Sequence, residues 1–243
     1  MPLVLEIGGR RWAVKLSGDG IDLQEATQLF RSGSQIVRAE VLPEPDAIVL
    51  QADEFELLEE AREVRDAAER ILVPLNAILY LEDPIRKPIA ISTVHRRNVD
   101  GCWNVTFFAQ SASVRIRGAK ARALAGSLGA PIPPSPQSVW VQTALDQEDV
   151  ADLLSYLRET PDWIALYKVY ETLDKHIGSR NVSITGWPSK SQISTFTRAA
   201  QLHRHSKAWN KKKGITAKDD MIFDDASALV RSMIRAWLEW RSS

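Results

Sequence analysis

Apolar and polar positions alternate near the N-terminus and follow a helical period near the C-terminus. Strict alternation predicts short strands at residues 3–7, 12–16, 36–42 and 47–50, and Gly8-Gly9 predicts a tight turn that joins the first two as a hairpin. A short helix is expected at residues 23–30. The first part of the chain is therefore predicted to be built on an antiparallel sheet.

A long helix is predicted after these strands. Asp53 is placed to cap it, Pro74 is expected to kink it or to end its first part, and its apolar positions recur at helical spacing. These positions are Leu57, Leu58, Ala61, Val64, Ala68, Ile71, Leu72 and Leu75. A second set of strands follows at residues 89–93, 103–107 and 114–116, with a turn at 98–101, and the long helix is expected to cover the core side of this meander. Residues 1–126 are predicted to form an α+β domain.

Residues 127–138 hold four prolines and predict a stiff, extended linker. The pattern beyond it is helical, so residues 139–243 are predicted to form a small all-α helical-bundle domain. Its helix starts are predicted from capping residues: Asp146, then Thr160 with Pro161, then a capping box from Ser189, and finally Asp224 or Asp225. The predicted fold class is α+β.

Charge is distributed unevenly along a chain whose formal net charge is zero. Residues 1–174 carry 18 basic and 26 acidic side chains, whereas residues 175–218, the basic tract, carry ten Lys or Arg, three of the four His, and no Asp or Glu. A second run, the acidic segment at residues 53–69, holds eight carboxylates and two arginines, and a solvated helix face is the simplest interpretation of it. The neutral total hides a dipolar molecule, and the basic tract is where a site is expected.

The sequence also limits the cellular setting and the chemistry. Cys102 is the only cysteine, which excludes an intramolecular disulfide and a multi-cysteine zinc site. No signal-peptide pattern and no apolar run long enough to cross a membrane are visible, so a cytoplasmic protein with no membrane partner is expected. The sequence has no glycine-rich phosphate loop and no nucleophile elbow, and it predicts no cofactor and no metal.

Three interpretations of the basic tract remain open. In the first, residues 211–214 form a flexible solvated loop, Trp209 packs, and no ligand binds. In the second, the tract binds RNA or DNA without catalysis: cations contact phosphates while Trp209 stacks on a base. The cations are Arg198, Arg204, Lys207, Lys211, Lys212 and Lys213. The same charges are also suited to an acidic protein surface, including the acidic segment of the same chain or of a second copy in a homodimer.

The third interpretation is catalytic. Arg198 and His203 have the Arg-x4-His spacing that resembles the signature of HEPN-fold ribonucleases, which are helical proteins that usually act as dimers. The resemblance implies a metal-independent endoribonuclease in which His203 is the acid/base group and Arg198 stabilises charge on the phosphate. Arg204 with His205 forms a second candidate pair. The polar residue usual directly after the arginine is here Ala199.

The C-terminal half also resembles a loosely defined group of uncharacterised bacterial soluble proteins over about 80 residues. The matching motifs are Leu166-Tyr167-Lys168 with Glu171, Phe196-Thr197 with Ala200 and Arg204-His205, and Ala236-Trp237-Leu238. No activity comes with this resemblance. It implies that Tyr167, Lys168 and Arg204-His205 belong to one constellation, in which Tyr167 and Lys168 join the predicted binding residues.

Overall fold

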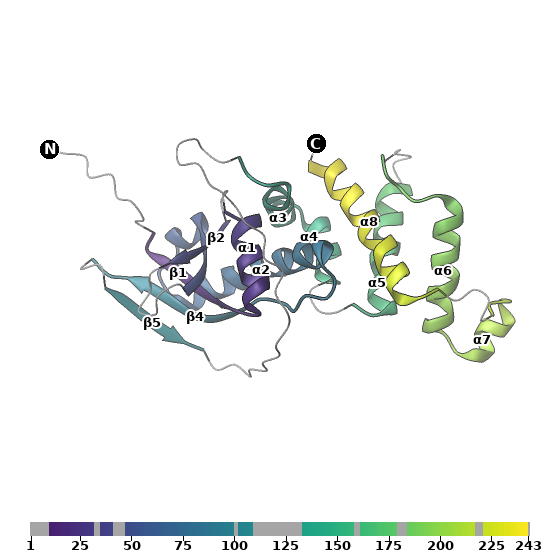
Figure 1. Ribbon diagram of the computed structural model, residues 1–243, viewed down its shortest axis with the longest axis horizontal. Helices are drawn as coiled ribbons and strands as arrows, with labels where there is room; N and C mark the ends of the chain where they lie inside the picture. Colours follow the sequence, from purple (N-terminus) through teal and green to yellow (C-terminus); the bar gives the residue numbers. More distant parts are fainter. Residues whose placement is uncertain are drawn as a thin grey trace. The chain divides into compact units, whose positions relative to one another are not determined.

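The computed structural model describes residues 10–31, 35–40, 47–99, 102–108, 133–157, 161–178, 184–216 and 221–242. Its antiparallel sheet and helices confirm the α+β class (Figure 1). The chain divides into two compact units. The first comprises Met1–Asn76 and Arg86–Gln142, and the second comprises Ala77–Ile85 and Thr143–Ser243.

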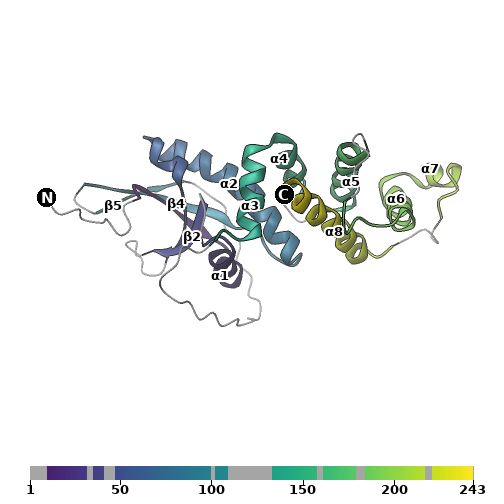
Figure 2. The same ribbon diagram turned by 90° about the horizontal axis from the view of Figure 1, so that it is seen from above.

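The first unit is organised around a five-stranded sheet in which every paired strand runs antiparallel to its neighbour, in the order β2-β3-β1-β4-β5. Its elements are β1 (Trp12–Ser17), α1 (Gly20–Leu29), β2 (Gln35–Glu40), β3 (Ala47–Ala52), η1 (Asp53–Leu57), α2 (Ala61–Glu82), β4 (Ala90–Arg97) and β5 (Trp103–Phe107). The central strand β1 buries the consecutive residues Trp12, Ala13 and Val14, so both of its faces are covered. Helix α2 runs along the sheet (Figure 2), and Asn76 exchanges two 2.8 Å hydrogen bonds with the backbone of Ile89 just before β4.

The predicted start of the long helix is wrong. Residues Asp53–Leu57 form the separate 3-10 helix η1, Leu57 is 84% exposed, and α2 begins only at Ala61. Tertiary contacts with Arg11 separate η1 from α2. The Arg11 guanidinium donates to the carbonyl oxygen of Leu58, and the Arg11 backbone N–H donates to the Glu56 carboxylate. The Glu63 carboxylate then accepts the Glu60 N–H at the start of α2, as in half of a capping box.

The predictions for Pro74, for the strands and for the linker can also be compared with the structure. Pro74 lies inside α2, which continues to Glu82, so Pro74 does not end the helix. Strands β1 to β5 and helix α1 lie close to where the alternation places them. The predicted strands at 3–7 and 114–116 and the Gly8-Gly9 turn lie outside the described residues. Within the predicted linker, residues 127–132 also lie outside them, and helix α3 (Pro136–Asp146) begins at Pro136, where the fixed φ of proline suits a first helical turn.

The second unit is helical in its described residues. It contains α4 (Glu148–Ser155), α5 (Trp163–Gly178), α6 (Lys190–Arg204), α7 (Lys207–Lys212) and α8 (Phe223–Ser242), and it takes in the ends of α2 and α3. The capping box predicted at Ser189 is confirmed. Two predicted caps are corrected: Gln147, not Asp146, precedes α4, and the Asp162 carboxylate accepts the Ala165 N–H at the start of α5.

Helix α5 packs against both α6 and α8, and the core between them contains Leu166, Val169, Leu173, Phe196 and Trp237. Among the described residues, no helix combines the length and the apolar character needed to cross a membrane.

Candidate functional site

Helices α5 and α6 form an antiparallel pair that divides the basic tract. Trp163, the first residue of α5, contacts His203 near the end of α6, and Tyr170 contacts Phe196 midway. Lys175 and Lys190 therefore lie at one end of the pair, about 20 Å along the helix axis from Arg204 at the other end. Within the described residues, these two ends of the pair carry separate groups of charge. The end that carries α7 holds most of the predicted binding residues (Figure 1).

Three consecutive side chains at this end each lie on an aromatic ring. The His203 ring stacks on Trp163 with centroids 4.4 Å apart and an interplanar angle of 8°, and the His205 ring stacks on Trp209 at 3.9 Å. Between them, the Arg204 guanidinium carbon lies 3.9 Å from the centroid of Tyr167. We call these three residues and their rings the platform. The contact implied for Tyr167 and Arg204 is confirmed.

The turn from α6 into α7 explains why the platform forms here. Helix α6 ends as His205 adopts an extended conformation, and the Ser206 hydroxyl then accepts the Trp209 N–H and caps α7. The buried Asn210 side chain donates to the carbonyl oxygens of Leu202 and His205 at 3.0 and 3.3 Å. It thereby satisfies carbonyl groups that a helix end leaves unpaired, and it fixes α7 against α6.

Helix α7 ends in a Schellman motif. The Ile215 N–H donates to the carbonyl oxygen of Asn210, the Gly214 N–H donates to that of Lys211, and Gly214 has a φ of +66°. Ile215 is buried beside the turn, as is usual for this motif. The interpretation of residues 211–214 as a flexible loop is therefore wrong for Lys211 and Lys212, which lie in a capped helix.

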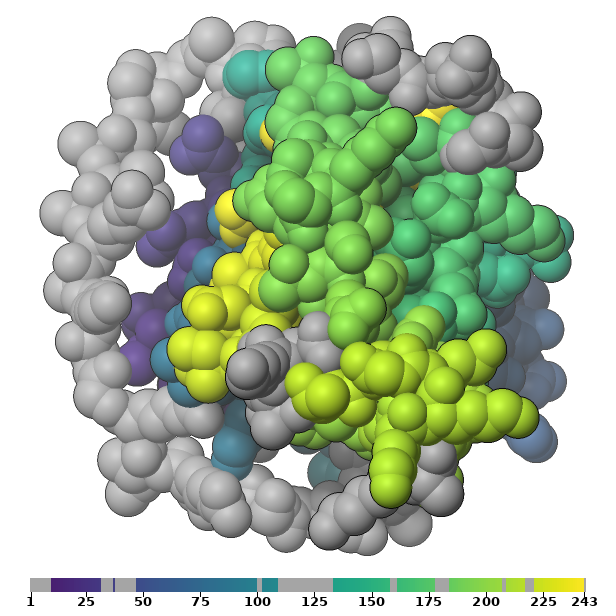
Figure 3. Space-filling model, turned by 90° about the vertical axis from the view of Figure 1, so that its right-hand side faces the viewer, coloured from purple at the N-terminus to yellow at the C-terminus, as the bar shows by residue number. Residues whose placement is uncertain are grey.

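Lys211, Lys212 and Lys213 are exposed on and just after α7. The segment that contains α7 lies on the face of the molecule seen in Figure 3. The Lys213 ammonium lies 5.8 Å from the Trp209 ring centroid, and His205 stacks on that ring. The tryptophan expected to stack on a base is thus already in contact with side chains of its own chain. The exposed ring next to it is that of His205.

The other predicted residues have different neighbours. Arg198 donates to the carbonyl oxygen of Gly214 at 3.3 Å and so supports the turn after α7. Arg198 and His203 both lie in α6, where a separation of five residues places their side chains about 140° apart around the axis. Lys168 lies near Tyr156, with its ammonium 5.6 Å from the ring centroid, and not with Arg204. Lys207 is the first residue of α7, and its side chain lies outside the described residues.

Stacking determines which parts of these cations remain available. A guanidinium or imidazolium on a ring uses the face of its plane, which leaves the N–H groups at the edge to donate to an anion. The C-terminal end of α6 also favours positive charge, because the last carbonyls carry partial negative charge. The layer below the platform is partly dry: burial, followed by the charges of Asp174, Tyr167 and Glu171, raises the pKa of Tyr170.

The acidic segment, in contrast, is already engaged within the first unit. Asp53 pairs with Arg10 at 2.6 Å, and Glu59 pairs with both Arg11 and Arg96. Two further pairs join Glu69 to Arg65 and Glu54 to Arg70. Each of these arginines lies in the first unit.

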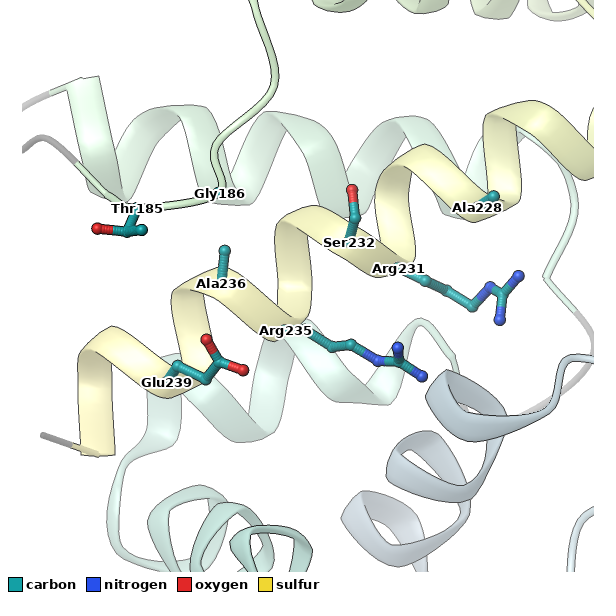
Figure 4. A pocket seen from close by; sticks show the side chains of 8 residues that line it. All are labelled: Thr185, Gly186, Ala228, Arg231, Ser232, Arg235, Ala236 and Glu239. Atoms are coloured by element: carbon teal, nitrogen blue, oxygen red, sulfur yellow. The ribbon is translucent and has the colours of Figure 1, made fainter.

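Two hollows in the second unit contain charged side chains that already have partners. A groove of about 610 Å³ between α4 and α5 contains Asp149, which accepts from Arg241 at 2.9 Å. A groove of about 400 Å³ along α8 is lined by Arg231 and Arg235, which leave the helix on one side while Ser232 points to another (Figure 4). Both arginines donate to the carbonyl oxygen of Leu81 at the end of α2. These hydrogen bonds stabilise the C-terminal end of α2.

Within the described residues, no group of three or more His, Cys, Asp or Glu side chains is arranged to hold a metal ion. No family model, no curated protein and no solved structure matches the chain. The site is therefore defined by geometry alone.

Sequence reasoning missed several residues that build the site. Trp163 was assigned only to the helix core, and Ser206, Asn210 and Phe223 were not singled out. Phe223 contacts Trp163 edge-on at 5.6 Å. A signal for α7 was present in the sequence, because Ser206 is a favoured N-cap residue and Gly214 a favoured residue just past a helix end. The contacts of His203 with Trp163 and of Arg204 with Tyr167 join residues about 40 positions apart, and no local pattern encodes them.

Proposed function

We propose that the second unit binds nucleic acid, RNA or DNA, through the platform and the lysines of α7, and that it does so without catalysis. The observation that carries this proposal is the stacking of His203, Arg204 and His205 on three rings beside exposed lysines. The Tyr167 ring fixes the Arg204 guanidinium and leaves its donors at the edge, which is the arrangement that recognises phosphate oxygens.

The contacts expected are mainly to the backbone of the nucleic acid. Arg204 and Lys211–Lys213 supply fixed positive charge, and the exposed His205 ring supplies a further donor. With about five phosphate contacts to a single strand, the logarithm of affinity should fall with the logarithm of salt with a slope of about −3.5. Affinity should then drop on the order of a hundredfold between about 50 and 200 mM salt.

Fluorescence anisotropy with a short labelled RNA strand, measured across a salt series, tests this function. Changing Lys211, Lys212 and Lys213 to Glu should weaken binding on the order of a hundredfold at low salt and reduce the salt slope by about 2. The matched control changes Arg62, Lys175 and Lys190 to Glu. These three residues are also exposed, and two of them belong to the basic tract but lie at its other end.

The two variants have the same change in net charge, but the substituted residues lie at different places in the protein. The proposal predicts that the control binds within about threefold of the wild type. Lys175 and Lys190 lie about 20 Å along the helix axis from Arg204, which is farther than the Debye length, and Arg62 belongs to a different unit. Equal losses in both variants would show that only overall charge matters. An unchanged affinity in the α7 variant would remove the proposed function.

The catalytic alternative is tested in the same samples. A ribonuclease that uses the platform histidines would shorten the labelled RNA, and His203→Ala or His205→Ala would stop it. The proposal predicts intact RNA in all samples. Cleavage that disappears in either histidine variant would replace binding with hydrolysis as the function.

The assembly alternative requires the acidic segment to be available to the basic tract. Ion pairs join carboxylates of this segment to Arg10, Arg11, Arg65, Arg70 and Arg96 of its own unit. We therefore expect the sedimentation coefficient to be the same at low and high salt. Dissociation at high salt would instead support pairing of the two charged regions between copies.

A further inference from the structure

An apolar strip lies directly beside the platform. It consists of Trp163 and Ile164 at the start of α5 and of Ile222 and Phe223 at the start of α8. The two helix starts meet where Phe223 contacts Trp163, and Trp163 in turn carries His203. The strip and the platform are therefore continuous through one tryptophan.

The strip is open to solvent at its isoleucines. Ile222 is 70% exposed and Ile164 is 49% exposed, while Trp163 and Phe223 are partly buried. A single exposed isoleucine is ordinary on a protein surface. Here the two isoleucines are the direct chain neighbours of two rings that contact each other, and exposed apolar side chains brought together in this way are typical of a ligand contact.

Negative charge borders the strip on the side of the helix starts. Asp162 caps α5, and Asp224 and Asp225 lie in the first turn of α8, where the helix dipole favours them. These carboxylates repel phosphates, whereas the lysines on α7 attract them. A bound strand is thereby oriented, with its phosphates toward α7 and its uncharged bases toward the apolar strip.

We infer that this site takes unpaired rather than duplex nucleic acid, holding the phosphates along α7 and the bases of the strand on the apolar strip. The inference rests on the proposed function and names its substrate class. Bases in a duplex are stacked inside the helix and present only their edges, so they do not reach a flat apolar surface. Bases of a single strand can splay out and pack on aromatic and apolar side chains.

Three probes of equal length separate the contributions of phosphates, bases and strandedness. They are a labelled single strand, the same strand without its bases, and a duplex, each titrated by anisotropy against the full-length protein. The intact strand should bind at least about fivefold more tightly than the abasic strand, because each well-packed base contributes on the order of fivefold or more. Equal affinity for the intact and abasic strands would overturn the inference, and no binding of either would instead overturn the proposed function.

Variants locate the base contact. The double variant Ile164→Ser with Ile222→Ser should bind the intact strand as weakly as the abasic one and should leave abasic binding unchanged. The matched control is Leu57→Ser with Ile85→Ser, because these residues are 84% and 64% exposed and belong to no part of the site. The control should retain the preference of the wild type for the intact strand.

Thermal unfolding checks that both variants fold, and the comparison of intact with abasic strands in the wild type needs no variant. If the Ile164 and Ile222 changes leave the preference for bases intact, the strip is not the base contact and the inference fails. If they alter the sedimentation of the free protein and not its binding, the strip joins two copies of the chain and the inference fails as well.

Discussion

The acidic segment and the basic tract are both runs of like charge in the sequence, yet charged side chains are used in opposite ways around them. In the first unit, Arg11 directs its donors at the Glu59 carboxylate and at the carbonyl oxygens of Glu56 and Leu58, so its donors hold the fold together. In the second unit, Arg204 lies with its face on Tyr167, which positions the group and leaves its donor edge for a ligand. A charge run becomes a candidate binding site when its members rest on rings and not on opposite charges.

The largest effect expected from this comparison is on stability. Arg11→Ala removes two part-buried hydrogen bonds to backbone carbonyl groups and an exposed pair with Glu59, and it should lower the free energy of unfolding by about 2 to 3 kcal/mol. Arg70→Ala is the matched change, since it removes an exposed pair with Glu54 and should lower that free energy by about 0.2 to 1 kcal/mol. Urea unfolding of both variants measures the difference. Similar losses would mean that Arg11 does not hold η1 and α2 in place.

A smaller effect is expected on binding. Tyr167→Leu keeps an apolar side chain but removes the ring under Arg204, so affinity for a short RNA strand should fall about threefold to fivefold. Tyr156→Leu is the control. Tyr156 follows α4 and its ring lies near Lys168, not near Arg204, so this substitution should leave affinity unchanged. Anisotropy titrations at one salt concentration compare the two. A larger loss for Tyr156→Leu would move the site toward the groove between α4 and α5.

The smallest effect concerns alkaline pH. Burial and nearby negative charge raise the pKa of Tyr170 above that of an unfolded tyrosine, which is about 10. The unfolded chain then loses this proton first as the pH rises, so the contribution of Tyr170 to stability is present below about pH 10 and is lost as the pH rises through the folded pKa. Tyr170→Phe should show a shallower loss of stability above about pH 10, measured by urea unfolding at several pH values. Identical alkaline profiles would argue against a partly dry layer beneath the platform.

Local patterns predicted much of the fold. The alternation in β1, β4 and β5 and the capping box of α6 depend on residues that are close together in the chain. Pattern reasoning failed where distant residues decided the outcome. Arg11 separates η1 from α2, and proline content suggested an extended chain where α3 begins.

The site was predictable in part for the same reason. Because residues 175–218 contain no carboxylates, the sequence indicated where the cations are. It did not indicate which aromatic ring each cation contacts. The antiparallel packing of α5 and α6 places Trp163 under His203 and Tyr167 under Arg204, and it separates Lys175 and Lys190 from them. Trp209 shows the limit of composition: an aromatic residue among lysines indicated base stacking, whereas its ring supports His205.

The central claim is that a nucleic acid strand binds at the end of the second unit where α6 meets α7. An NMR titration of isotope-labelled protein with a short RNA strand at low salt tests it residue by residue. We predict that the amide signals of residues 203–213 and the indole signals of Trp163 and Trp209 shift together and saturate at one stoichiometry, while those of residues 53–69 stay in place. Signals that shift evenly over the whole chain, or at Lys175 and Lys190 in place of the platform, would contradict the claim.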